Sequence, residues 1–152
     1  MRLFKVLAPD GSPIWGGTGK WHLPRQCKNG KWIPGKWMPK INDVIPCMSG
    51  YHLCRRKDVL EWMVDPAWGL SGLWCIECPS PILCEAEYRG DIIKTAKKVV
   101  VQQARLIRIT DMTVSDSWML SGSYNTWCGS QSVKKRNEAT LKRMMRIIDR
   151  NR

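Results

Sequence analysis

Residues 15–40 form a long stretch whose hydrophobic residues follow neither a helical nor a strand period. Gly, Pro and Lys residues interrupt this stretch repeatedly. A loop of this length inside a compact domain is usually functional or disordered, and four exposed indole rings would leave too much apolar surface in water for plain disorder. The fold must therefore hold a long ordered loop, whose tryptophans are Trp15, Trp21, Trp32 and Trp37.

Within this loop, residues 31–37 form a near-repeat that places two indoles beside two ammonium groups. Such interleaving can stack bases while holding phosphates. Alternatively, the indoles fold back as a lid on a sheet while the lysine side chains reach out to solvent. On the first interpretation, the residues that contact nucleic acid or a protein partner include Lys31, Trp32, Lys36 and Trp37.

Short apolar runs on either side of the loop predict strands at 2–8, 51–54 and 82–88, and the last run continues to residue 93. A β-branched stretch at 98–109 predicts one strand or two. Residues 55–64 carry apolar side chains at helical spacing and precede Asp65-Pro66, which is typical of a short helix and its end.

These elements predict a single α+β domain over residues 1–131, with a small and mostly antiparallel sheet, one short helix and long Trp-rich loops. The length of 152 residues suits one hydrophobic core. Residues 132–152 predict a separate basic amphipathic helix packed on that domain, because an apolar stripe follows the N-cap candidate Ser132.

The formal net charge of +12 is concentrated at the two ends of the chain. Residues 1–57 carry +9, residues 58–131 carry −3, and residues 132–152 carry +6. If both ends fold onto one side, they make a positive face that attracts polyanions, whereas a merely solvated surface is the alternative. The tail candidates for contact with nucleic acid or a partner are Lys134, Lys135, Lys142, Arg143 and Arg146.

No window holds the roughly 18 apolar residues of a membrane span, and the first residues lack the apolar run of a signal peptide. We therefore expect a protein without a membrane span, in the cytoplasm where it is made. In that compartment the seven cysteines are more typical of thiols or metal ligands than of a disulfide framework.

Cys75-x-x-Cys78 has the spacing of a chelating turn for tetrahedral zinc. Cys84 is the nearest third ligand. A bound zinc ion would be structural and would pin the loop at residues 66–84, while a redox dithiol and unrelated buried thiols are the alternatives. The fourth ligand is open: Cys128 is our candidate, beside Cys54, Cys47, Cys27 and His52.

Four blocks carry a resemblance to an uncharacterised family of small phage and bacterial proteins. They are residues 16–24, 35–39, 46–54, and 85–90 with 98–101. The chain resembles this family over roughly residues 1–109. The resemblance implies an accessory protein of a phage or mobile element, acting in the cytoplasm of a bacterial host.

The order of a Gly-Tyr-His-Leu-Cys strand, a helix and a Glu-x-Glu strand also looks like the layout of mono-ADP-ribosyltransferases. That resemblance implies an NAD-dependent enzyme in which Glu87, beside Glu85, is the catalytic acid residue. His52 and Arg2 would contact NAD. An exposed strand face explains the same two carboxylates without catalysis.

The sequence therefore favours a non-enzymatic binding protein of phage type with a structural zinc ion. Its basic surface would engage nucleic acid or a host nucleoprotein. An inhibitor of a defence system such as a CRISPR nuclease is the setting that the phage resemblance suggests. The ADP-ribosyltransferase-like enzyme is the alternative hypothesis.

Overall fold

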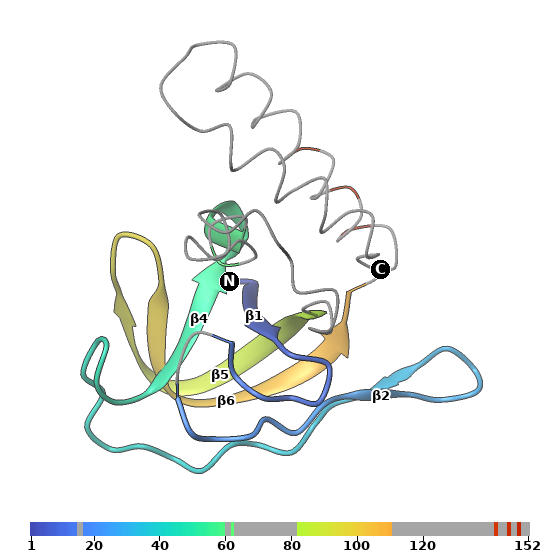
Figure 1. Cartoon of the computed structure of the whole chain (residues 1–152), viewed down its shortest axis with the longest axis horizontal. Helices are drawn as coiled ribbons and strands as arrows, with labels where there is room; N and C mark the ends of the chain where they lie inside the picture. The colour runs from blue at the N-terminus through green and yellow to red at the C-terminus, as the bar shows by residue number, and fades with distance from the viewer. Residues whose placement is uncertain are drawn as a thin grey trace, which may run out of the picture.

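The computed structural model describes residues 1–14, 17–59, 62, 82–110, 142, 146 and 149. Four strands form a closed antiparallel barrel in the order β1-β4-β6-β5 (Figure 1). A small second sheet pairs β2 with β3. The strands are β1 (Leu3–Leu7), β2 (Arg25–Gln26), β3 (Trp32–Ile33), β4 (Tyr51–Arg55), β5 (Ile82–Lys94) and β6 (Val99–Ile109).

The long hairpin of β5 and β6 closes the barrel. β5 pairs with β1 along one edge, and β6 pairs with β4 along the other. The register of the hairpin shifts at Glu85/Ala86 and again at Arg89/Ile92. Such bulges bend a strand and increase its twist, so that one hairpin can reach both short strands.

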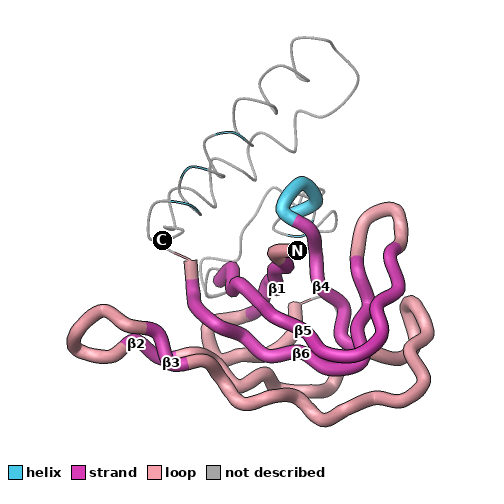
Figure 2. The backbone as a smooth tube through the Cα atoms, turned by 180° about the vertical axis from the view of Figure 1, so that it is seen from behind, coloured by secondary structure: helices cyan, strands magenta, loops and turns pink. Residues whose placement is uncertain are grey.

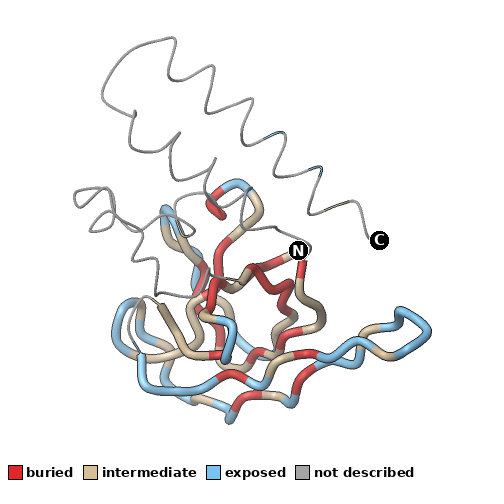
Figure 3. The backbone as a smooth tube through the Cα atoms, turned by 45° about the vertical axis from the view of Figure 1, so that its right-hand side comes forward, coloured by how far each residue is buried: buried red, intermediate tan, exposed pale blue. Residues whose placement is uncertain are grey.

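Buried residues gather in the barrel (Figure 3), and both faces of β1 are apolar apart from Lys5. Leu3 and Leu7 of β1 belong to the main core, while Phe4 and Val6, which alternate with them, are also buried. Strands buried on both faces read as continuous apolar runs rather than as an alternation of polar and apolar residues. Other members of the main core are Leu53, Cys84, Ala86, Val99, Val101, Ala104 and Leu106.

The Trp-rich loop is ordered because its second half lies along β6 (Figure 2). The amides of Gly35, Met38 and Ile41 donate hydrogen bonds of 2.9–3.0 Å to three carbonyls of β6. Trp21 and Met38 are only 6% exposed and join the main core. This part of the loop therefore covers the barrel with Trp21 and Met38, whereas Trp32 and Trp37, the indoles of the near-repeat, are half-buried.

The predicted strands at 2–8, 51–54 and 82–93 are confirmed, and the stretch at 98–109 is one strand. The predicted α+β class is wrong. Most of the described residues that belong to regular structure lie in strands; a short 3-10 helix, η1 (Arg56–Asp58), is present, and no helix of seven or more residues occurs among them. The sequence missed the class because the barrel closes through the pairing of the β5–β6 hairpin with β1 and β4, and local sequence patterns do not reveal such long-range pairing.

The α+β prediction rested on two helices. Of the one expected at 55–64, Arg55 instead ends β4, residues 56–58 form η1, Val59 and Trp62 are helical, and the other residues lie outside the described part of the chain. Of the basic helix expected at 132–152, only Lys142, Arg146 and Asp149 are described. The domain limits at 131 and 132 therefore stay a prediction. Within the described ranges, no helix is both long enough and apolar enough to cross a membrane.

We predict that Gly35→Ala destabilises the barrel, because a Cβ at this position would lie 1.9 Å from the backbone oxygen of His22. The expected loss is about 2 kcal/mol in the free energy of unfolding, as for an overpacked core. Urea denaturation measures it. Gly19→Ala is the matched control, since its Cβ would meet only the end of Met38 at 3.7 Å. Equal midpoints for the two variants would contradict the prediction.

Candidate functional site

The β2–β3 hairpin extends away from the barrel as an arm (Figures 1 and 2). Arg25 pairs with Ile33 and Gln26 with Trp32. The turn is closed by its own hydrogen bonds: the Cys27 amide donates to the Lys31 carbonyl at 2.8 Å, and the Gly30 amide donates to the Cys27 carbonyl at 2.9 Å. Gly30 takes a positive φ of 81°, which suits glycine.

The arm is strongly basic. No carboxylate occurs between Asp10 and Asp43, although this interval holds six Lys or Arg residues. All six are exposed, and the four that lie on or next to the hairpin make no ion pair within the described part of the chain. Their positive charge is therefore available to a partner. These four residues, which we call the arm cations, are Arg25, Lys28, Lys31 and Lys36.

Trp37 follows the arm and carries two stacked arginines. The guanidinium carbon of Arg89, from β5, lies 4.1 Å from the centroid of the indole ring, and that of Arg105, from β6, lies 4.7 Å away. Arg105 also forms an ion pair with Glu87. The backbone amide of Met38 donates to Ala104, which holds the segment in place. Each such cation–π contact is worth about 0.5–1 kcal/mol at an exposed site.

The structure places Lys31, Trp32, Lys36 and Trp37 on one continuous segment, as the near-repeat requires. Sequence reasoning missed Arg89 and Arg105, because their approach to Trp37 depends on strand register. The sequence could have indicated Arg25 and Lys28, because the loop that holds them contains no acidic residue. Together these eight residues, four of them arm cations, make a basic surface with half-buried indoles, which we call the arm surface.

The tail candidates are only partly covered by the structure. Lys142 and Arg146 are exposed, whereas Lys134, Lys135 and Arg143 lie outside the described residues. The described contact between the two ends of the chain joins opposite charges. Arg2 Nη1 donates to Asp149 Oδ1 at 3.0 Å, and Arg56 also pairs with this carboxylate. At this contact a tail carboxylate neutralises cations near the N-terminus.

Glu85 is the centre of a partly buried ion-pair cluster. Arg2 donates to both of its carboxylate oxygens at 2.6 and 2.9 Å, and Arg108 Nε donates to Oε2 at 2.7 Å. Burial alone would raise the pKa of Glu85, but the hydrogen bonds and charges of the two arginines outweigh it and lower that pKa. The geometry is that of a carboxylate held ionised by its partners.

The four residues of the ADP-ribosyltransferase-like layout do not meet in one place. Arg2 and Glu85 form an ion pair, while Glu87 pairs with Arg105 instead. His52 is paired with Val100 and Glu85 with Arg108, positions eight residues apart along β6. Both carboxylates are thus engaged by arginines, and His52 lies far from them along the sheet.

Cys84, the third zinc ligand in the sequence analysis, lies fully buried in the barrel core, and burial raises the pKa of its thiol to about 12. Cys75, Cys78 and Cys128 are outside the described residues. Among the residues that are described, no group of three or more His, Cys, Asp or Glu side chains can hold a metal ion. The zinc site therefore stays a prediction for the loop at 66–84.

No family model, no curated protein and no solved structure matches this chain. The resemblance to small phage proteins stays a prediction. Two of its blocks are elements of the barrel: residues 50–54 include β4, and residues 85–90 belong to β5.

We predict that Glu85→Gln lowers the free energy of unfolding by about 3 kcal/mol at pH 7, because it removes the buried charge to which Arg2 and Arg108 both donate. A carboxyl whose folded-state pKa is lowered stabilises the protein above its unfolded pKa of about 4.3, and this contribution is lost as the pH falls through the folded-state pKa. In urea denaturation, the difference between variant and wild type should therefore shrink as the pH falls below the unfolded pKa and vanish below the folded-state pKa.

Glu87→Gln is the control for this measurement. The Glu87 side chain is 40% exposed, and a surface ion pair contributes only about 0–1 kcal/mol. If Glu85→Gln and Glu87→Gln lost the same free energy of unfolding at pH 7, the proposed stabilising role of the Glu85 ion-pair cluster would be contradicted.

Proposed function

We propose that the protein is a non-enzymatic nucleic-acid-binding protein that uses the arm surface to hold single strands. The observation that carries the proposal is the juxtaposition of unpaired arm cations with Trp37 and its two stacked arginines. Phosphates need cations that are not neutralised by neighbouring carboxylates, and unstacked bases need flat apolar or guanidinium surfaces.

The arm cations suit a phosphate backbone. Arg25, Lys28 and Lys31 lie on a hairpin that extends away from the barrel (Figure 1). Lys36 adds another positive charge directly before Trp37. An exposed strand-turn-strand arm can follow a nucleic-acid chain without rearranging the core, because only two short strands and a turn contact the partner.

Stacking favours a single-stranded partner over a duplex. Trp32 and Trp37 are half-buried rather than enclosed, so each keeps part of its ring accessible. The guanidinium planes of Arg89 and Arg105 add a second flat surface against which a base can pack. Bases inside a duplex do not offer their faces, so the indoles would contribute little to duplex binding.

The phage resemblance supplies a biological setting for this activity. A small basic protein of a phage or mobile element would meet nucleic acid or a host nucleoprotein in the bacterial cytoplasm. Occupying the single strand that a CRISPR nuclease uses is one way in which such a protein would blunt a defence system. The Lys and Arg residues of the tail, including Lys142 and Arg146, would extend the contact.

Charge reversal on the arm tests the proposal. We expect Lys28→Glu with Lys31→Glu to weaken binding of a fluorescent single-stranded oligonucleotide at least tenfold in anisotropy titrations. The slope of log K against log salt should become shallower by about 0.7 for each phosphate contact that is lost. Lys57→Glu with Lys94→Glu is the matched control, since both lysines are exposed and the change in net charge is identical. Equal weakening in both pairs, or binding that ignores salt, would overturn the proposal.

Removing the indole at the end of the arm tests the stacking component separately. Trp37→Leu should weaken single-strand binding by about 1–3 kcal/mol, which is the range measured for one base–aromatic stack. The titration is repeated with a duplex of the same sequence, for which we expect a much smaller change. Far-UV circular dichroism and the urea midpoint verify that the variant is folded. An equal loss for duplex and single strand would exclude stacking as the source of preference.

A further inference from the structure

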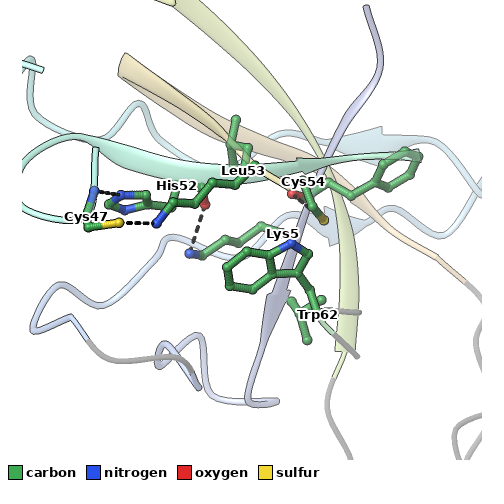
Figure 4. A pocket seen from close by; sticks show the side chains of 9 residues that line it. Lys5, Cys47, His52, Leu53, Cys54 and Trp62 are labelled. Carbon is green, nitrogen blue, oxygen red and sulfur yellow. Dashed lines mark hydrogen bonds between the residues drawn. The ribbon is translucent and has the colours of Figure 1, made fainter. Parts of the chain in front are cut away.

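A cavity of about 270 Å³ opens where β1 and β4 separate. These strands pair only at Leu3–Arg55 and Phe4–Cys54, and beyond that point they diverge. The gap is lined from β1 by residues 4–6 and from β4 by residues 52–54 (Figure 4). It lies away from the arm surface, which follows β6, so its role is independent of the nucleic-acid proposal.

Lys5 supplies the first positive charge in this cavity. Its Nζ donates a hydrogen bond of 3.0 Å to the backbone oxygen of His52 and lies 5.3 Å from the ring centroid of Trp21. An ammonium has three N–H donors, so this single acceptor leaves two of them for a ligand. The side chain keeps some exposure, yet loss of water around Nζ lowers the pKa of Lys5 to about 8, helped by the charge of Lys98.

Lys98 supplies the second positive charge, from the turn that precedes β6. Its Nζ donates to the sulfur of Cys47 at 2.9 Å, and Cys47 in turn donates its backbone N–H to His52 Nε2 at 3.1 Å (Figure 4). Because Nε2 accepts a hydrogen bond, the proton of this neutral imidazole sits on Nδ1. Burial, with Lys98 and Lys5 nearby, lowers the pKa of His52 to about 4, so the ring stays uncharged at neutral pH.

The described lining holds two ammonium groups and no carboxylate. Placing two like charges together, partly out of water, is unfavourable unless an anion compensates them. The indole of Trp62 lies beside Lys5 and forms an aromatic wall of the cavity (Figure 4). The cavity therefore combines a cationic end with a flat apolar wall.

We propose that this cavity binds a small organic oxyanion, whose carboxylate or phosphate group lies between Lys5 and Lys98 and whose flat apolar body packs against Trp62. The two amines fix the charged end. The small volume limits the ligand to a compact molecule, such as one carrying a single aromatic ring.

Binding is coupled to the protonation of Lys5, since a bound anion favours its charged form. Two titratable groups beside Lys5 do not change charge near neutral pH: His52 is already neutral, and burial raises the pKa of the Cys54 thiol to about 12. A third, Lys98, donates a hydrogen bond to Cys47. We expect tighter binding at pH 7 than at pH 9.5, and uptake of protons when the complex forms near pH 8.5.

Isothermal titration calorimetry tests this proposal with benzoate and phenyl phosphate as probes, and with phenol as the neutral analogue. Titrations at pH 8.5 in two buffers of different ionisation heat measure proton uptake. Binding of benzoate alone assigns a carboxylate ligand, and binding of phenyl phosphate alone assigns a phosphate ligand. Failure of both probes to bind, or phenol binding as tightly as the charged probes, would overturn the proposal.

Two variants assign the binding to this cavity. Lys5→Met and Lys98→Met should each weaken binding of the charged probe at least tenfold, and Lys5→Met should also abolish proton uptake. Lys98→Met keeps the test valid if the loss of Lys5 disturbs the barrel. Lys94→Met, an exposed lysine near the same turn, should leave affinity unchanged. Unaltered affinity in both lysine variants of the cavity would refute the assignment, as would an equal loss in Lys94→Met.

Discussion

The pairing of β5 with β6 is the constraint on which the rest of the structure depends. These two strands are the longest in the described part of the chain, and each forms one wall against a short N-terminal strand. The bulges within the hairpin allow the curvature that closure needs. The same hairpin positions both sites, because β6 holds the Trp37 segment and the turn before it carries Lys98.

The positive charge of this chain is divided between two roles by burial. Arg2 and Arg108 form ion pairs with Glu85 inside the fold. The arm cations lack such partners among the described residues and remain exposed. Lys5 and Lys98 form a third case, in which the cations line a cavity with no carboxylate in its described wall. A net charge alone cannot distinguish these environments, although they imply different chemistry.

Local signals in the sequence were sufficient for the four barrel strands and for half of the arm surface, but not for β2 and β3. The apolar run at 82–93 and the β-branched run at 98–109 predicted β5 and β6, and the Lys-Trp interleaving indicated Trp32 and Trp37. The fold class failed because strand closure is a long-range property. Cys84 shows the same limit: its spacing from Cys78 suggests a ligand, whereas its place opposite Lys5 of β1 puts it in the core.

The amino-acid sequence by itself determined where the chain is extended, where it is basic and where indole rings stand beside lysines, since these follow from neighbouring residues. Only the tertiary structure decided that Arg89 and Arg105 stack on Trp37, that Arg2 binds Glu85, and that Lys5 faces Lys98 across a gap. The physical reason is that strand register and barrel closure bring together residues dozens of positions apart. Separation along the chain carries no information about that register until the strands pair.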